Sequence, residues 1–164
     1  MLCTTNRLSL TLINESKKIV LAVAMLLVVG ISSSFANTNN GGGNDAIQAS
    51  FKKDFNKAEL MATETGKSFT KLTFKMNDMI LFAFYDENGD LLAVVRNIRS
   101  SQLPISLMMN LKNDYSDYWI SDLFELTGEG STYYYITLEN ADTKITLKSN
   151  GTSNWEVYSR KAKQ

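Results

Sequence analysis

The feature that most constrains the fold is a series of short apolar segments separated by turn residues. Residues 69–76 alternate between apolar and polar side chains, which is typical of a strand with one buried face. Residues 79–85 are apolar throughout, and the polar segment 86–90 separates them from the apolar residues 91–95. Because an Asn-Gly pair lies in this polar segment, it predicts a β-hairpin whose two central residues have positive φ. Strands that are apolar on both faces are expected at the centre of a sheet.

Two helices are predicted among these strands. Asp45 is a favourable N-cap, and apolar side chains recur at helical spacing from Ile47 to Ala58, so a helix is expected over about residues 45–60. Leu103-Pro104 predicts the start of the second helix, because proline is tolerated in the first helical turn. Four further strands are predicted, at about residues 118–127, 131–139, 143–148 and 154–160.

Helices interleaved with hairpins favour an α+β fold, in which an antiparallel sheet has its helices packed on one face. A single domain is expected over residues 45–164. Segments 82–96 and 145–160 share a strand, an Asn-Gly turn, a second strand and a terminal arginine. This likeness predicts a tandem repeat of a helix and a β-meander, over about residues 45–100 and 103–160. The alternative is that two unrelated hairpins resemble each other through their turn chemistry alone.

Residues 1–36 have the organisation of a signal peptide. Two adjacent lysines precede an apolar stretch at residues 19–29, and small side chains lead up to a cleavage site after Ala36. The alternative is an uncleaved membrane anchor, but 11 apolar residues fall well short of the roughly 20 that span a bilayer. We therefore expect cleavage after Ala36, a flexible Asn/Gly-rich leader at residues 37–44, no stable membrane span after cleavage, and a periplasmic or secreted protein.

Composition argues against several classes of function. The chain has 17 basic and 17 acidic residues, so no bulk positive charge attracts nucleic acid, and no nucleic-acid partner is expected. It has no histidine, which removes the usual general base and the commonest metal ligand. Its single cysteine, Cys3, lies in the segment that is expected to be removed. We therefore predict a non-enzymatic protein with no catalytic residue, no metal site and no cofactor.

Several segments together resemble one known group of proteins. They are F-K-K-D-F at 51–55, D-E-N-G-D-L-L-A-V-V-R at 86–96, L-P at 103–104 and Y-S-D-Y-W-I at 115–120. Taken with the export signal, these segments resemble the PepSY-like exported proteins of Bacteroidetes, which are grouped by fold with the β-lactamase inhibitor protein. The resemblance covers about residues 45–160 and implies the same α+β fold. That inhibitor is a disulfide-bonded binder whose open sheet face holds a β-lactamase, whereas this chain has no cysteine in the region and none of its residues matches an inhibitory residue.

Two polar motifs have both a structural and a functional interpretation. Asp86, Asn88 and Asp90 carry oxygen ligands for calcium, but they lack the length and the later glutamate of a calcium-binding loop, so a solvated hairpin turn is the preferred interpretation. Asn150-Gly151-Thr152 matches a glycosylation acceptor. The same residues also match a type I′ turn, which the flanking strands favour.

An aromatic cluster is the strongest candidate for a binding surface. Alternation along two adjacent predicted strands separates a set of side chains that face the core from a set on the opposite, open face. The core set is Ile120, Phe124, Leu126, Tyr134, Ile136 and Leu138. The open-face set is Trp119, Ser121, Leu123, Glu125, Tyr133, Tyr135 and Thr137.

The candidate partner-binding residues are Trp119, Tyr133, Tyr135, Leu123 and Tyr118. Tyrosine and tryptophan combine a large contact area with a polar tip, and they are enriched at binding hot spots. The alternative is ordinary cross-strand packing of aromatic side chains on a sheet. The predicted function is a non-catalytic binding module of the cell envelope, which uses the open face to hold an unknown protein or peptide. The alternative function is an inhibitor or regulator of an envelope peptidase or a β-lactamase-type hydrolase.

Overall fold

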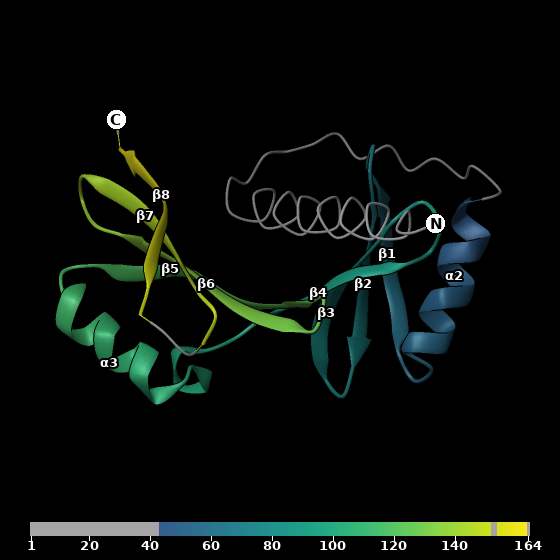
Figure 1. Ribbon diagram of the computed structural model, residues 1–164, viewed down its shortest axis with the longest axis horizontal. Helices are drawn as coiled ribbons and strands as arrows, with labels where there is room; N and C mark the ends of the chain where they lie inside the picture. Colours follow the sequence, from purple (N-terminus) through teal and green to yellow (C-terminus); the bar gives the residue numbers. More distant parts are fainter. Residues whose placement is uncertain (1–42, 152–153, 164) are drawn as a thin grey trace, which may run out of the picture.

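The computed structural model describes residues 43–151 and 154–163, which form one eight-stranded antiparallel sheet (Figure 1). Neighbours in the sheet are also neighbours in sequence, in the order β1 to β8. The first four strands are β1 (Glu59–Thr65), β2 (Thr70–Met76), β3 (Met79–Tyr85) and β4 (Leu91–Asn97). The last four are β5 (Trp119–Gly128), β6 (Ser131–Glu139), β7 (Thr143–Ser149) and β8 (Glu156–Ala162). The apolar strands β3 and β4 lie inside the sheet, as predicted.

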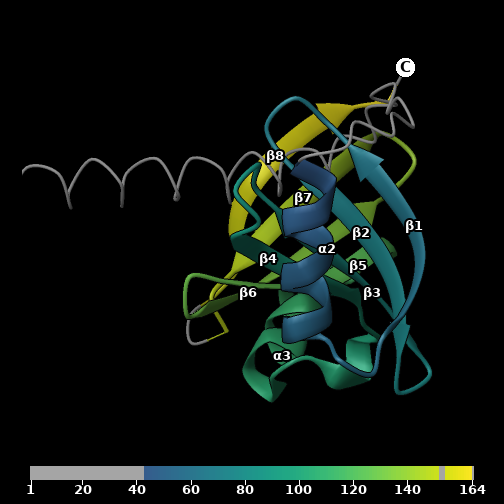
Figure 2. The ribbon, with the colours of Figure 1, turned by 90° about the vertical axis from the view of Figure 1, so that its right-hand side faces the viewer.

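Two α-helices, α2 (Gly43–Asp54) and α3 (Ile105–Asp114), accompany the strands, and a 3-10 turn, η1 (Ser100–Gln102), precedes α3. Each helix covers one half of the bent sheet (Figures 1 and 2). Strand register shows that the two helices lie on the same side of the sheet. Val94 belongs to the cluster beneath α2, and Arg96, two residues later in β4, lies on the same face and pairs with Glu125. Leu123, two residues before Glu125 in β5, belongs to the cluster beneath α3. Both helices therefore pack on one face of the sheet, as predicted. No described helix has the length and apolar character needed to cross a membrane.

The prediction for the first helix was wrong at its C-terminal end. Helix α2 ends at Asp54 rather than near residue 60, and residues 59–65 form β1, a strand that was not predicted. Phe55 and Ala58 still pack against the core beneath α2, so their spacing reflected burial beyond the end of the helix. Strand β1 lies at the edge of the sheet and is mostly exposed, so it lacks the alternation that reveals a half-buried strand.

The two Asn-Gly turns differ from the predicted geometry. At residues 88–89 only Gly89 has positive φ, 85°, and the Asp86 carboxylate accepts hydrogen bonds from the backbone N–H groups of Asn88 (2.9 Å) and Asp90 (2.8 Å). The hairpin and its interpretation as a turn are confirmed, but the turn is longer than type I′. Asn150 also lacks positive φ, and six residues separate β7 from β8, so a type I′ turn is wrong there as well. Thr152 lies outside the described residues.

Paired positive φ occurs instead in two hairpins that carry no Asn-Gly pair. Asn77 and Asp78 have φ of 50° and 59° between β2 and β3, and Glu129 and Gly130 have φ of 51° and 70° between β5 and β6.

The described chain has a helix followed by four strands, and this order occurs twice. A common origin of the two halves by duplication stays a prediction.

Three apolar clusters form the core. One lies beneath α2 around Phe51, Leu72 and Phe74, and a second lies beneath α3 around Leu111, Ile136 and Ile145. The third includes Phe84, Val95, Phe124, Leu126 and Tyr135, which belong to the face of the sheet away from both helices. The face away from the helices was predicted to be open, but part of it is buried in this third cluster.

Candidate functional site

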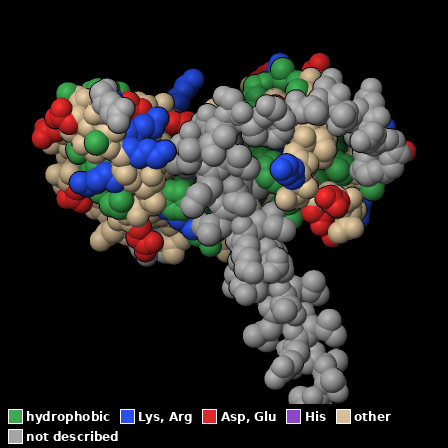
Figure 3. Space-filling model, turned by 90° about the horizontal axis from the view of Figure 1, so that it is seen from above, with side chains coloured by type: hydrophobic (Ala, Val, Ile, Leu, Met, Phe, Trp, Pro, Cys, Tyr) green, Lys and Arg blue, Asp and Glu red, His purple; other side chains and the backbone are tan. Residues whose placement is uncertain are grey.

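We call the sheet face away from α2 and α3 the helix-free face, and the opposite one the helix-covered face. Strand register assigns the side chains of the helix-free face, because directly paired residues lie on the same side of a sheet. Its aromatic residues are Phe82, Phe84, Trp119, Phe124, Tyr133, Tyr135 and Tyr158. Its lysines include Lys71, Lys144, Lys148 and Lys163. In Figure 3, which views the molecule from above Figure 1, basic side chains gather over the half that contains β5 to β8.

A β-bulge in β5 changes which residues reach this face. Ile120 pairs with Leu138 and Asp122 pairs with Thr137, so Ser121 is an extra residue without a register partner in β6. Beyond the bulge, Leu123 pairs with Ile136 on the helix-covered face, and Phe124 and Leu126 turn to the helix-free face. The predicted faces of Leu123, Glu125, Phe124 and Leu126 were therefore wrong, because strict alternation does not allow for an inserted residue.

The five predicted binding residues do not form one patch. Leu123 is only 6% exposed in the core beneath α3, and Tyr118 packs against that same core beside Tyr115. Tyr135 lies on the helix-free face but is 1% exposed. Its ring stacks on Phe124 at 5.1 Å and meets Tyr158 edge-to-face at 5.5 Å.

Trp119 and Tyr133 are the two predicted residues that reach the surface of the helix-free face. Trp119 is 54% exposed and Tyr133 is partly buried. Trp119 pairs with Glu139, which is six residues from Tyr133 along β6, so the two side chains are about 20 Å apart at the usual rise of a strand. The helix-free face is therefore elongated, with an exposed tryptophan at one end and a group of tyrosines further along.

Lysine side chains lie over aromatic rings along this face. The Nζ atom of Lys148 is 4.3 Å from the ring centroid of Tyr133 and 5.7 Å from that of Tyr135. Lys163 Nζ lies 4.6 Å from the Trp119 ring, and Lys71 Nζ lies 5.1 Å from the Phe82 ring. A cation over an aromatic face is attracted by the ring quadrupole, so each lysine is held against the sheet.

The sequence analysis did not select these lysines. A signal was present, because Lys144, Thr146 and Lys148 recur at spacing two within the strand that was predicted at residues 143–148. The face of that strand was not assigned.

Carboxylates neutralise most of the lysines on this face. Glu139 Oε2 is 2.7 Å from Lys163 Nζ, and Glu139 Oε1 is 3.2 Å from Lys144 Nζ. Hydrogen bonds from Lys163, Ser121 and Lys144 lower the pKa of Glu139 to about 2. Lys71 Nζ lies 3.1 Å from Glu64.

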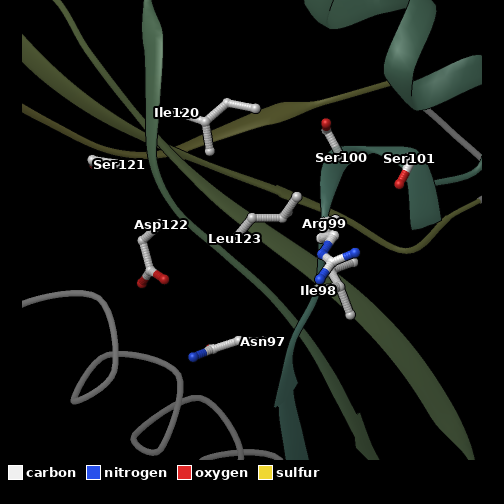
Figure 4. A pocket seen from close by; sticks show the side chains of 9 residues that line it. All are labelled: Asn97, Ile98, Arg99, Ser100, Ser101, Ile120, Ser121, Asp122 and Leu123. Atoms are coloured by element: carbon white, nitrogen blue, oxygen red, sulfur yellow. The ribbon is translucent and has the colours of Figure 1, made fainter.

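A hollow of about 590 Å³ opens beside the bulge, where β4 ends and β5 continues (Figure 4). Strand β4 pairs with β5 only as far as Asn97 and Phe124, and the Ile98 N–H donates to the Leu123 carbonyl at 3.1 Å. Burial raises the pKa of Asp122, and the Leu123 N–H and Lys144 act in the opposite direction. Residues 97–101 and 120–123 line this hollow. Within residues 43–151 and 154–163, no group of three or more His, Cys, Asp or Glu side chains is placed to hold a metal ion.

Polar groups on the helix-covered face find partners inside the chain. Between the two helix-backed clusters, Arg96 Nε donates to Glu125 Oε1 at 2.9 Å and Arg96 Nη2 donates to Glu125 Oε2 at 3.1 Å. The pKa of Arg96 is raised by this pairing. Trp155 Nε1 donates to the Leu107 carbonyl at 2.9 Å, which ties the loop before β8 to α3. These polar groups of the helix-covered face are thus satisfied by hydrogen bonds within the chain.

No protein-family model matches the chain, and no curated protein matches its sequence. Solved structures from Bacteroides do share its fold. A candidate periplasmic protein from Bacteroides eggerthii has a TM-score of 0.65 at 15% identity, with 74% of this chain and 90% of that chain covered. A DUF2874 family protein from Bacteroides uniformis has a TM-score of 0.63 at 16% identity, with 71% and 87% covered.

A BLIP-like protein from Bacteroides fragilis has a TM-score of 0.62 at 19% identity, with 72% of this chain and 84% of that chain covered. BLIP is the β-lactamase inhibitor protein. The resemblance that the sequence motifs indicated is therefore confirmed at the level of the fold. At these identities the likeness establishes the fold alone.

Proposed function

We propose that this protein is an exported, non-catalytic binding module of the cell envelope that holds a protein or peptide partner on its helix-free face. The observation that carries the proposal is the exposed Trp119 on a sheet whose opposite face is already covered by helices. Exposed aromatic side chains on a rigid support are favourable hot-spot residues, because little conformational entropy is lost when they are buried. The absence of histidine from the sequence supports a non-catalytic role.

The decisive experiment compares one exposed residue on each face. The full chain is crosslinked in its own envelope, the partner is identified by mass spectrometry, and the purified partner is then titrated against protein variants. Trp119→Ala should weaken binding at least about tenfold, as expected of a hot-spot residue. Ile105→Ala removes an apolar side chain on α3 that is 72% exposed, and it should leave the affinity unchanged. Equal affinities for Trp119→Ala and the wild type would reject this face as the binding site.

Export is part of the same proposal. Cleavage after Ala36 rests on residues outside the described part of the chain, and the shared fold with a candidate periplasmic protein from Bacteroides eggerthii supports the setting. N-terminal sequencing of the extracytoplasmic protein should begin at or within a few residues of Asn37. Recovery of the folded full-length chain from the cytosol would contradict the proposed location.

A second candidate function is inhibition or regulation of an envelope peptidase or a β-lactamase-type hydrolase. It is supported by the fold shared with a BLIP-like protein. A panel of such hydrolases is assayed with excess protein, and an inhibited enzyme should recover activity when Trp119→Ala replaces the wild type. If no hydrolase changes its rate, this candidate is rejected and the more general binding role remains.

A further inference from the structure

Lys148 differs from Lys71, Lys144 and Lys163 on the helix-free face. It is partly buried near the C-terminal end of β7, paired in register with Tyr135 on one side and with Glu156 on the other. Lys71, Lys144 and Lys163 each have a carboxylate within 4.0 Å, but among the described residues Lys148 has none, Glu156 included. Its ammonium group faces the rings of Tyr133 and Tyr135 instead. A partly desolvated cation therefore lacks a counter-charge at this point.

A second unmet group belongs to the same aromatic cluster. The hydroxyl of Tyr158 is buried and has no hydrogen-bond partner in the described part of the chain. Tyr158 meets the same Tyr135 ring that Lys148 approaches, at 5.5 Å between ring centroids. Native structures rarely leave a buried hydroxyl without a partner, so this group calls for an acceptor from elsewhere.

The tyrosines of this cluster supply donors rather than negative charge. Burial raises the pKa values of Tyr135 and Tyr158, and the neighbouring Tyr158 and Tyr133 hydroxyls raise that of Tyr135 further. The phenols of Tyr135 and Tyr158 are therefore protonated near neutral pH and able to donate. The cluster combines one ammonium group with phenolic O–H groups on a wall of aromatic carbon.

The missing group must carry acceptor oxygens and one negative charge. A carboxylate meets both requirements, because it accepts from an ammonium and a hydroxyl at once and balances a single positive charge. A phosphate group brings about −1.5 to −2 charges near neutral pH, which one lysine does not balance. Since the cluster lies on an elongated face rather than in an enclosed cavity, the carboxylate is better supplied by a side chain of a docked protein than by a free small acid.

We infer that Lys148, Tyr133 and Tyr158 form an anchor for an aspartate or glutamate side chain of the partner that docks on the helix-free face. This inference rests on the proposed function, because it names the chemistry that the partner presents at the tyrosine end of that face. Exclusion of water by the surrounding aromatic rings strengthens the ammonium–carboxylate contact. Trp119, about 20 Å away at the other end, contributes apolar contact instead.

A matched pair of peptides tests the anchor without the natural partner. The full chain is titrated with acetyl-Phe-Glu-amide and acetyl-Phe-Gln-amide, and the NMR signals of the Lys148 side chain report binding. The glutamate peptide should bind about tenfold more tightly than the glutamine peptide, as expected for a charge-assisted contact. Lys148→Met should abolish that preference, whereas Lys161→Gln, a control on the exposed strand β8, should retain it. Equal binding of the two peptides, or no shift at Lys148 with either, would overturn the inference.

Tyr158→Phe separates a binding role from a structural one. Removal of an unsatisfied buried hydroxyl should leave the unfolding midpoint unchanged or raise it, while the preference for the glutamate peptide falls severalfold. A lower midpoint with an unchanged preference would show that the hydroxyl serves the fold and contradict its place in the anchor. Titration of the variants with the protein partner that crosslinking identifies distinguishes the two proposals. Binding that survives Lys148→Met but not Trp119→Ala overturns the anchor alone, and binding that survives both rejects the face.

Discussion

The two faces of this sheet differ in how their polar groups are partnered. On the helix-covered face, Arg96 and Glu125 form a two-point ion pair between the clusters beneath the helices. On the helix-free face, Lys148 faces aromatic rings without a carboxylate partner among the described residues, and the buried Tyr158 hydroxyl has no partner there either. The same backbone carries both faces, so secondary structure does not cause the difference.

This difference identifies the face of the sheet whose polar groups can still bind a partner. A buried polar group without a partner costs free energy, and a folded domain minimises the number of such groups. On the helix-covered face, the polar groups of Arg96, Glu125 and Trp155 have hydrogen-bond partners within the chain. The unmet groups and the exposed Trp119 all lie on the other face, at its two ends. Substitutions on the helix-covered face are therefore expected to affect stability, and substitutions of the exposed Trp119 or of the unmet groups on the helix-free face to affect binding.

The largest effect on stability is expected beneath α3. Leu107 is fully buried, so Leu107→Ala should lower the free energy of unfolding by about 2–5 kcal/mol through lost burial and an internal cavity. Ile105→Ala on the same helix is the control, because Ile105 is largely exposed and its loss should change stability by less than about 0.5 kcal/mol. Urea unfolding measures both. Similar losses for the two variants would contradict the packing of α3 described above.

A smaller loss is expected at the ion pair of the helix-covered face. Arg96→Met leaves the Glu125 carboxylate without its two-point donor, and since both side chains are only partly exposed, the loss should be about 1–2 kcal/mol. The double variant Arg96→Met/Glu125→Met should be more stable than the single variant, because no charge is then left without a partner. A double variant that loses the sum of both single effects would show that the pair is not coupled.

Trp119→Ala tests the same contrast from the helix-free side. More than half of the Trp119 side chain is exposed, so its loss should lower the free energy of unfolding by less than about 1 kcal/mol. The measurement is urea unfolding beside Leu107→Ala under identical conditions. A loss as large as that of Leu107→Ala would mean that Trp119 serves the fold, and the comparison between the faces would fail.

The smallest expected effect concerns the pH dependence of stability. Glu139 has a folded-state pKa of about 2, below its usual value of 4.5, so its contacts with Lys163 and Lys144 favour the folded chain above pH 4.5. This contribution should be lost as the pH falls through 2. The stability difference between the wild type and Glu139→Gln should therefore narrow across this range. An NMR titration of the Glu139 carboxyl that gives an ordinary pKa would contradict the expectation.

Much of the fold followed from local patterns. The hairpin at Asp86–Asp90, the start of α3 after Pro104 and the span of β6 agree with expectation, because turn chemistry and alternation act over a few residues. Strand β1 was missed because an edge strand buries too little to alternate. The candidate site was predicted only in part: Trp119 and Tyr133 reach the helix-free face, whereas Leu123 lies beneath α3.

Local patterns were enough to predict the α+β class, seven of the eight strands and the alternation of β6, since each depends on neighbours a few positions apart. Tertiary structure decided which side chains became available to a partner. The extra residue Ser121 reversed the faces of the residues after it. Tyr135 became buried because its ring stacks on Phe124 and meets Tyr158 edge-to-face. Lys148 meets Tyr133 only when β6 and β7 pair in one particular register. Register and bulges depend on contacts between separate strands, so local periodicity does not contain them.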